Sequence, residues 1–326
     1  MIELREFKSI FKNEFQNLIN LKRAEHFKYG SEELMFLRID EYFCNIGLTE
    51  KRLTKDDCAK WCKYRKHESP STYNHRISGL RIFTSYLKDL GYDVYVPTNI
   101  GVKVPKYNAH IYTDDELRRF FKAVDQSQSV PDECPYRALV MPLFFRILYT
   151  SGFRLSELRL LKVKDFHIDE GYITVRYAKN SKERNVPVHP ELVRRCRELK
   201  NSIHQLSDDD EYFFMIRPHT PMTLQNVYHN FRRYLEKAGI SHTGKGPRVH
   251  DFRHTYCVNL IRKWSSEGKN LMNYMPYMKT MLGHETFLET AYYLKLTHQL
   301  FPDLVWKMDT FYPKMIEVDD NDKEFY

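Results

Sequence analysis

The sequence predicts a mainly α-helical protein of two domains, with one small β-hairpin in the second domain. Apolar residues recur at helical spacing through most of the chain. Residues 172–188 instead alternate polar and apolar residues on both sides of a Lys-Asn-Ser-Lys turn, which is typical of a hairpin. Residues 97–110 contain two prolines and a glycine without periodicity, so they are predicted to link the two domains.

The first domain, residues 1–96, is expected to be helical throughout. Its periodic segments are residues 4–27, 31–46, 54–65 and 71–90. Thr54 is followed by two aspartates and fits a helix N-cap, while Gly47 and Gly91 fit helix ends.

The predicted helix at residues 71–90 combines an apolar stripe with basic residues. The stripe consists of Ile77, Leu80, Phe83, Thr84 and Leu87, and the residues mostly off it are Tyr73, His75, Arg76, Arg81 and Lys88. A solvated basic face is the usual meaning of such a pattern.

The second domain is expected to begin near Ile111. Thr113 and Glu116 form a capping box at the start of its first helix. Residues 137–149 are an apolar helix that ends at a Thr-Ser-Gly turn before Arg154. After the hairpin, two further amphipathic helices are expected, the second capped by Thr223. The final residues, 314–326, are acidic and predicted to be disordered.

Composition favours a polyanionic partner. The 326 residues include 51 Lys and Arg against 43 Asp and Glu, a net charge of +8. Six cysteines are scattered without metal-ligand spacing, which indicates reduced thiols in a cytoplasmic protein. No apolar run is long enough to span a membrane, and the N-terminal residues do not resemble a signal peptide.

Residues 249–295 carry a constellation suited to phosphodiester chemistry. His250 and Arg253 lie three residues apart on a predicted helix and share one face, and His284 precedes Tyr293 by nine residues. A tyrosine with a pKa of about 10 needs a site that stabilises developing negative charge. Arginine forks suit phosphate oxygens, and Arg154 supplies a second fork that the nearby Glu157 can orient.

Five motifs, TSGFRLSEL, the lysine hairpin, HDFRH, LGHE and the terminal tyrosine, occur in one order over roughly residues 110–300. In this respect the chain resembles the tyrosine recombinase, or phage integrase, family, and particularly its compact Xer-like members. The resemblance implies a two-domain clamp. A helical core-binding (SAM-like) domain would cover residues 1–96, and an α+β catalytic domain with a C-terminal helix would cover residues 111–313.

The resemblance also implies the reaction and its residues. The activating set would be Arg154, Lys179, His250, Arg253 and His284, and the nucleophile would be Tyr293. Cleavage would give a 3′-phosphotyrosyl link and a free 5′-hydroxyl, with neither metal nor other cofactor. The adjacent Tyr292 is the competing nucleophile, and Lys182 competes with Lys179 as the acid that protonates the leaving oxygen.

Double-stranded DNA at specific recombination sites would be the partner. Residues expected to contact it are Tyr73, Arg76, Arg81, Lys103, Lys106, Lys182, Lys245 and Arg248. The family resemblance implies a homotetramer on DNA, a C-terminal helix that docks on a neighbouring protomer, and a cytoplasmic, nucleoid-associated protein that could work with an accessory factor.

Integration or excision of a mobile element is the favoured use. Dimer resolution, DNA inversion, a type IB topoisomerase-like activity and a non-catalytic DNA-binding accessory factor are the alternatives. His250 and His254 also have the spacing of a helical zinc motif, but the sequence has Asp251 where such a motif needs a glutamate, and His254 is interpreted as a core residue.

Overall fold

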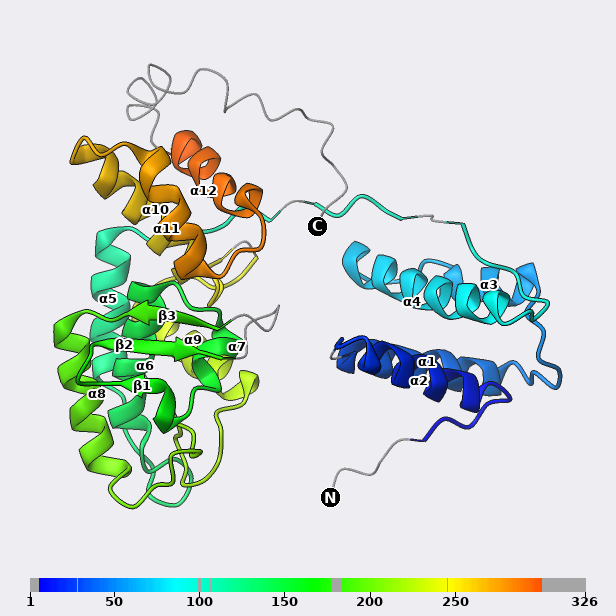
Figure 1. Ribbon diagram of the computed structural model, residues 1–326, viewed down its shortest axis with the longest axis horizontal. Coiled ribbons are helices and arrows are strands. Elements are labelled where there is room, and N and C mark those ends of the chain that lie inside the picture. Colours follow the sequence, from blue (N-terminus) through cyan, green and yellow to red (C-terminus); the bar gives the residue numbers. More distant parts are fainter. Residues whose placement is uncertain are drawn as a thin grey trace. The chain divides into compact units, whose positions relative to one another are not determined.

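The computed structural model describes residues 6–27, 29–98, 101–105, 107–176, 183–244 and 246–300, with side chains described as far as residue 297. The chain divides into two compact units, Met1–Tyr107 and Asn108–Tyr326, drawn in Figure 1. The mainly helical fold with one small sheet is confirmed.

The first unit is built from four helices around an aromatic core. They are α1 (Lys12–Ala24), α2 (Gly30–Asn45), α3 (Lys55–Cys62) and α4 (Pro70–Asp89). Phe15 and Phe83 stack with ring centroids 3.6 Å apart, which joins α1 to α4. Thr54 caps α3 in a capping box with Asp57, as the sequence predicted.

Helix α4 differs from the sequence prediction in which side chains it buries. Tyr73 and Arg76 were placed off the apolar stripe, but both are buried. The Arg76 guanidinium donates to both carboxylate oxygens of Glu68 at 2.8 Å, to the Lys63 carbonyl at 3.1 Å and to the Trp61 carbonyl. The donors of Arg76 are therefore taken up by partners inside the unit, and its expected contact with DNA is not supported.

The second unit combines helices with a three-stranded antiparallel sheet. In order, its elements are α5 (Asp114–Asp125), α6 (Arg137–Ser151), α7 (Leu155–Arg159), a 3-10 turn (Val163–Asp165), β1 (Phe166–His167), β2 (Tyr172–Val175), β3 (Arg184–Pro187), α8 (Pro190–Ile203), α9 (Leu224–Lys237), α10 (Asp251–Ser266), α11 (Leu271–Leu282) and α12 (Phe287–Leu300). Strands β2 and β3 pair with Ile173 opposite Val186, so the predicted hairpin is confirmed.

Two hydrophobic clusters hold this unit together. The larger one, which includes Phe120, Phe145 and Phe252, joins α5, α6 and α9 to the start of α10. The smaller one includes Val258, Met278 and Tyr293 and joins α10, α11 and α12. Figure 1 shows these three helices grouped at one end of the unit and the sheet with α8 at the other.

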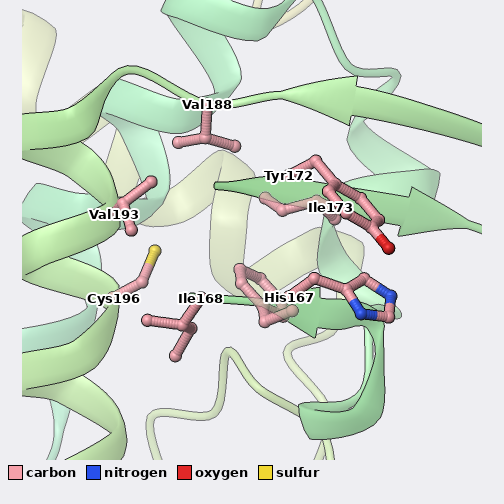
Figure 2. A pocket seen from close by; sticks show the side chains of 8 residues that line it. His167, Ile168, Tyr172, Ile173, Val188, Val193 and Cys196 are labelled. Carbon is pink, nitrogen blue, oxygen red and sulfur yellow. The ribbon is translucent and has the colours of Figure 1, made fainter. Parts of the chain in front are cut away.

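A small apolar cavity lies between the sheet and α8 (Figure 2). Its labelled side chains are His167, Ile168, Tyr172, Ile173, Val188, Val193 and Cys196. His167 stacks on Tyr172 with ring centroids 4.3 Å apart and also contacts the Thr174 hydroxyl at 3.0 Å. None of the residues that line this cavity belongs to the predicted active site, so the cavity is a packing feature.

Over the described part of the chain, none of the helices is both long enough and apolar enough to cross a membrane. The described residues also contain no group of three or more His, Cys, Asp or Glu side chains arranged to hold a metal ion.

Candidate active site

Arg154 is presented by a tight turn between α6 and α7. Gly152 takes a left-handed conformation (φ +61°), and a Cβ on it would lie 2.8 Å from the Tyr256 ring, so only glycine fits. Arg154 then becomes the N-cap of α7. Its backbone N–H donates to Glu157 Oε2 at 2.9 Å and its Nη1 donates to Glu157 Oε1 at 2.9 Å. Glu157 therefore fixes both the turn and the direction of the guanidinium.

Arg253 lies on the first turn of α10 and is 2% exposed. It donates to the Gly152 carbonyl at 2.6 Å, to the Leu282 carbonyl at 2.8 Å and to His284 Nε2 at 2.8 Å. One guanidinium thus ties the turn that carries Arg154 to the loop that carries His284.

His284 follows Gly283, which ends α11 in a left-handed conformation. Its Nδ1 lies 2.8 Å from the Thr290 hydroxyl. Because arginine can only donate, Nε2 of His284 must accept from Arg253, and the ring proton must be on Nδ1. Burial, together with the charges of Arg253 and Arg154, lowers the pKa of His284 to about 3. The ring is therefore neutral at neutral pH.

His250 stands at the N-cap of α10; the residue is exposed, and its ring packs edge-on against the ring of His254. Desolvation, followed by the charges of Arg253 and Arg154, lowers its pKa to about 4. The His254 ring lies 4.9 Å from the His250 ring and 5.6 Å from the Tyr293 ring. His254 Nδ1 is buried without a hydrogen-bond partner among the described residues, which fits the predicted interior position of His254.

Tyr293 is 3% exposed and packs within the cluster formed by α10, α11 and α12. Its ring is nearly parallel to that of His284, at a centroid distance of 6.0 Å. Burial, helped by the nearby Cys257 and opposed by Arg253, raises the pKa of Tyr293 well above its usual value. The neighbouring Tyr292 is 38% exposed. In this conformation the predicted nucleophile is a packed, neutral phenol.

Arg184 is a site residue that the sequence analysis missed. It begins β3, its side chain is 6% exposed, and its Nη2 lies 2.6 Å from Glu157 Oε2. The missed signal was strand alternation, because Arg184 shares a face with Val186 and therefore points inward.

The structure brings Arg154, Arg253, His284 and Tyr293 together, with His250 at the edge of the group. Lys179 and Lys182 lie outside the described residues, as do Lys106 and Lys245. Of the remaining residues expected to contact DNA, Lys103 and Arg248 are exposed, Arg81 is half-buried, and Tyr73 and Arg76 are buried.

Comparison with known proteins shows which family this chain belongs to. Residues 111–299, more than half of the chain, match the sequence profile of the phage integrase family. The tyrosine recombinase XerA of Thermococcus kodakarensis is 27% identical over 240 residues, covering 72% of this chain and 76% of that protein. The tyrosine recombinase XerC of Salmonella typhi is 26% identical over 251 residues, covering 77% and 76%.

Among solved structures, the Tn1549 transposon integrase in complex with transposon right end DNA shares the fold. It aligns with a TM-score of 0.62 at 16% identity and covers 92% of this chain and 98% of that one. Fold, site and relatives together define a tyrosine recombinase, an enzyme that breaks and rejoins DNA at specific sites. The chain belongs to the phage integrase family, as its motifs predicted.

Proposed function

We propose that this recombinase joins one strand of a DNA duplex to Tyr293 and then passes the strand to a new 5′-hydroxyl, integrating or excising a mobile element. The observation that carries the proposal is the convergence of Arg154, Arg253 and His284 on the loop that precedes the helix of Tyr293. Two fixed guanidinium groups and a neutral imidazole form a site for one phosphodiester.

Each residue then has a role in a balanced reaction. Tyr293 Oη forms the new bond to phosphorus, and the bond from phosphorus to the 5′-oxygen breaks. Arg154 and Arg253 stabilise the charge that gathers on the non-bridging oxygens. His250, which is neutral, accepts the proton that Tyr293 Oη loses as it attacks, and His284, whose Nε2 accepts from Arg253, holds that guanidinium against the phosphate. We assign the proton that the 5′-oxygen receives to Lys179 rather than Lys182.

The buried phenol has to leave its packed position before this chemistry starts. A side chain that is 3% exposed cannot reach the phosphate of a bound duplex, and its raised pKa makes it a poor nucleophile. We therefore propose that DNA binding moves α12 so that Tyr293 approaches the phosphate beside Arg253.

Double-stranded DNA at specific recombination sites is the proposed partner. The XerH and lambda integrase structures that share this fold contain DNA. We assign residues 1–96 to core-site binding, residues 97–110 to a connecting strap, and residues 111–313 to catalysis. The phosphate contacts we retain are Arg81, Lys103, Lys106, Lys182, Lys245 and Arg248. A homotetramer with C-terminal helices exchanged between protomers, acting at the nucleoid, completes the proposal.

A nicked suicide duplex tests the proposal directly. Cleavage beside the nick releases a short fragment, so the covalent adduct accumulates and is seen as a protein–DNA band under denaturing conditions. An adduct that forms equally well in EDTA supports the mechanism. A protein that binds the duplex and never forms the adduct would instead be a DNA-binding accessory factor. Relaxation of any supercoiled plasmid, without strand exchange, would favour the topoisomerase alternative.

A further inference from the structure

Arg184 occupies an unusual position for a charged residue. It faces the interior of the unit with Val186, and its side chain is 6% exposed. Burying a guanidinium is unfavourable unless its donors are satisfied. Here Nε donates to the Met281 carbonyl at 2.9 Å, Nη1 to Glu157 Oε1 at 3.2 Å, and Nη2 to Glu157 Oε2 at 2.6 Å.

Both partners of Arg184 lead directly to the active site. Glu157 accepts from Arg184 and from Arg154 with the same two carboxylate oxygens. Met281 begins a run of three consecutive carbonyls at the end of α11, each of which accepts from a different arginine. Arg184 holds the first carbonyl, Arg253 holds that of Leu282, and Arg154 holds that of Gly283 at 3.1 Å.

The backbone before His284 also lies directly against Arg184. A Cβ on Gly283 would come within 2.8 Å of Arg184 Nη1 and 3.0 Å of its Cζ. The guanidinium is thus packed between the Glu157 carboxylate and the loop of His284, and a change in its shape moves one or the other.

We infer that Arg184 is a positioning residue for strand transfer: it fixes Glu157 and the 281–284 loop relative to each other, and so sets where Arg154, and Arg253 through its contact with His284, meet the phosphate. The inference rests on the proposed function. Lysine would restore the charge but not the planar fork that reaches two carboxylate oxygens and a carbonyl at once. Shape as well as charge therefore matters at this position.

The test uses the full chain with Arg184→Lys, Arg184→Met and a matched control, Arg146→Gln. Arg146 makes a bidentate pair with Asp125 in the same unit, at 2.7 and 2.8 Å, and does not touch the site. We expect single-turnover adduct formation to fall about 10²-fold in Arg184→Met and at least about 10-fold in Arg184→Lys, with DNA affinity unchanged. Arg146→Gln should cleave like the wild type.

If Arg184→Met fails to fold, the adduct rate of Arg184→Lys tests the inference. Arg184→Lys cleaving within about twofold of the wild type would overturn the inference. So would an equal loss in Arg146→Gln, because the effect would then be general destabilisation.

A pH profile separates positioning from simple stability. The charged and titratable groups that face Glu157 are Arg154, Arg184, His250 and His284. Burial favours a higher pKa for Glu157, and the contacts with Arg184 and Arg154 hold it below its usual value. Without Arg184 the carboxyl gains a proton more readily and releases Arg154. Cleavage by Arg184→Met should therefore decline further as pH falls from about 8 to about 6, and a profile parallel to wild type contradicts this.

A second readout does not depend on cleavage. In the DNA-free protein, ¹⁵N shifts of the His284 ring should report a proton on Nδ1, because Arg253 donates to Nε2. Arg184→Lys should mix the two tautomers as the loop shifts, and an unchanged spectrum would overturn the inference. If the wild-type protein forms no adduct, the proposed function fails, but this measurement still decides the role of Arg184.

Discussion

At the scale of single residues, the site is arranged to keep its imidazoles neutral. Desolvation and neighbouring guanidinium groups lower the pKa of His250 to about 4 and that of His284 to about 3. These neutral histidines can accept hydrogen bonds without adding positive charge to the site. Arg154 and Arg253 supply cationic donors beside them.

Substitution of each of the two adjacent tyrosines tests which one is the nucleophile. We expect Tyr293→Phe to bind DNA normally and form no covalent adduct, because the attacking oxygen is gone. Tyr292→Phe should form the adduct at a rate within about threefold of the wild type, since Tyr292 lies at the surface. Adduct yield on the suicide duplex measures both. An adduct from Tyr293→Phe, or its loss from Tyr292→Phe alone, would reassign the nucleophile to the exposed ring.

His284 predicts a pH-dependent stability. Its pKa is about 3 in the folded protein against 6.5 for the free side chain, so between these values the unfolded chain binds the extra proton. The contribution of His284 to stability is therefore fully present above pH 6.5 and falls as pH decreases. Urea titrations at several values between pH 7 and about pH 5 give the free energy of unfolding as a function of pH. His284→Asn should reduce the slope of this free energy against pH by up to about 1.4 kcal/mol per pH unit. Equal slopes for both proteins would mean that His284 is not desolvated.

At the scale of elements, the end of α11 is the junction of the site. The last carbonyls of a helix lack partners within the helix. Arg184 of β3, Arg253 of α10 and Arg154 at the start of α7 donate to three successive carbonyls there. The site therefore depends on one helix end held by three other elements.

Gly283 tests this junction. Gly283→Ala strains a left-handed backbone and also drives a methyl group into Arg184, whereas Gly268→Ala has the same strain (φ +67°) with open space around it. We expect Gly268→Ala to lower the free energy of unfolding by about 1–2 kcal/mol and to leave cleavage intact. Gly283→Ala should lose about 1–3 kcal/mol more and cleave slowly. Denaturant melts and adduct assays measure both effects. Equal stabilities and equal adduct rates for the two variants would show that the end of α11 does not control the site.

The buried arginine of α4 gives a second test at this scale. Arg76→Gln leaves the Glu68 carboxylate with fewer donors, so the first unit should lose about 1–3 kcal/mol of stability. Exposed Lys103→Gln should weaken DNA binding and leave the melting transition unchanged. Thermal melts and DNA titrations of both variants distinguish the roles, and a normal melt for Arg76→Gln with weakened binding would restore Arg76 as a DNA contact.

At the scale of the whole molecule, the chain folds as two compact units that each have their own aromatic or aliphatic core. The described residues that converge on the candidate site belong to the second unit. We therefore expect cleavage chemistry to be a property of that unit, and affinity and site choice to need both units.

Assembly on DNA provides the test at this scale. Removal of residues 299–326, most of which lie outside the described residues, is predicted to leave binding of one protomer intact. It should abolish the formation of higher DNA-induced assemblies, because the proposed exchanged helix is lost. Gel shifts and light scattering of the shortened and full chains on a two-site duplex measure this effect. Assemblies of unchanged size would show that the C-terminal segment does not dock on a neighbouring protomer.

The sequence by itself determined the helical fold, the hairpin, the capped helix starts and the motif residues Arg154, Arg253, His284 and Tyr293. These features rest on local periodicity, capping chemistry and short spacings, which a linear chain displays directly. Only the tertiary structure decided that Arg76 and Tyr73 are buried, that Tyr293 is packed away from solvent, and that Arg184 joins Glu157 to the 281–284 loop. Those facts depend on contacts between residues far apart in the chain, because burial of a charge is decided by the partners that surround it in space.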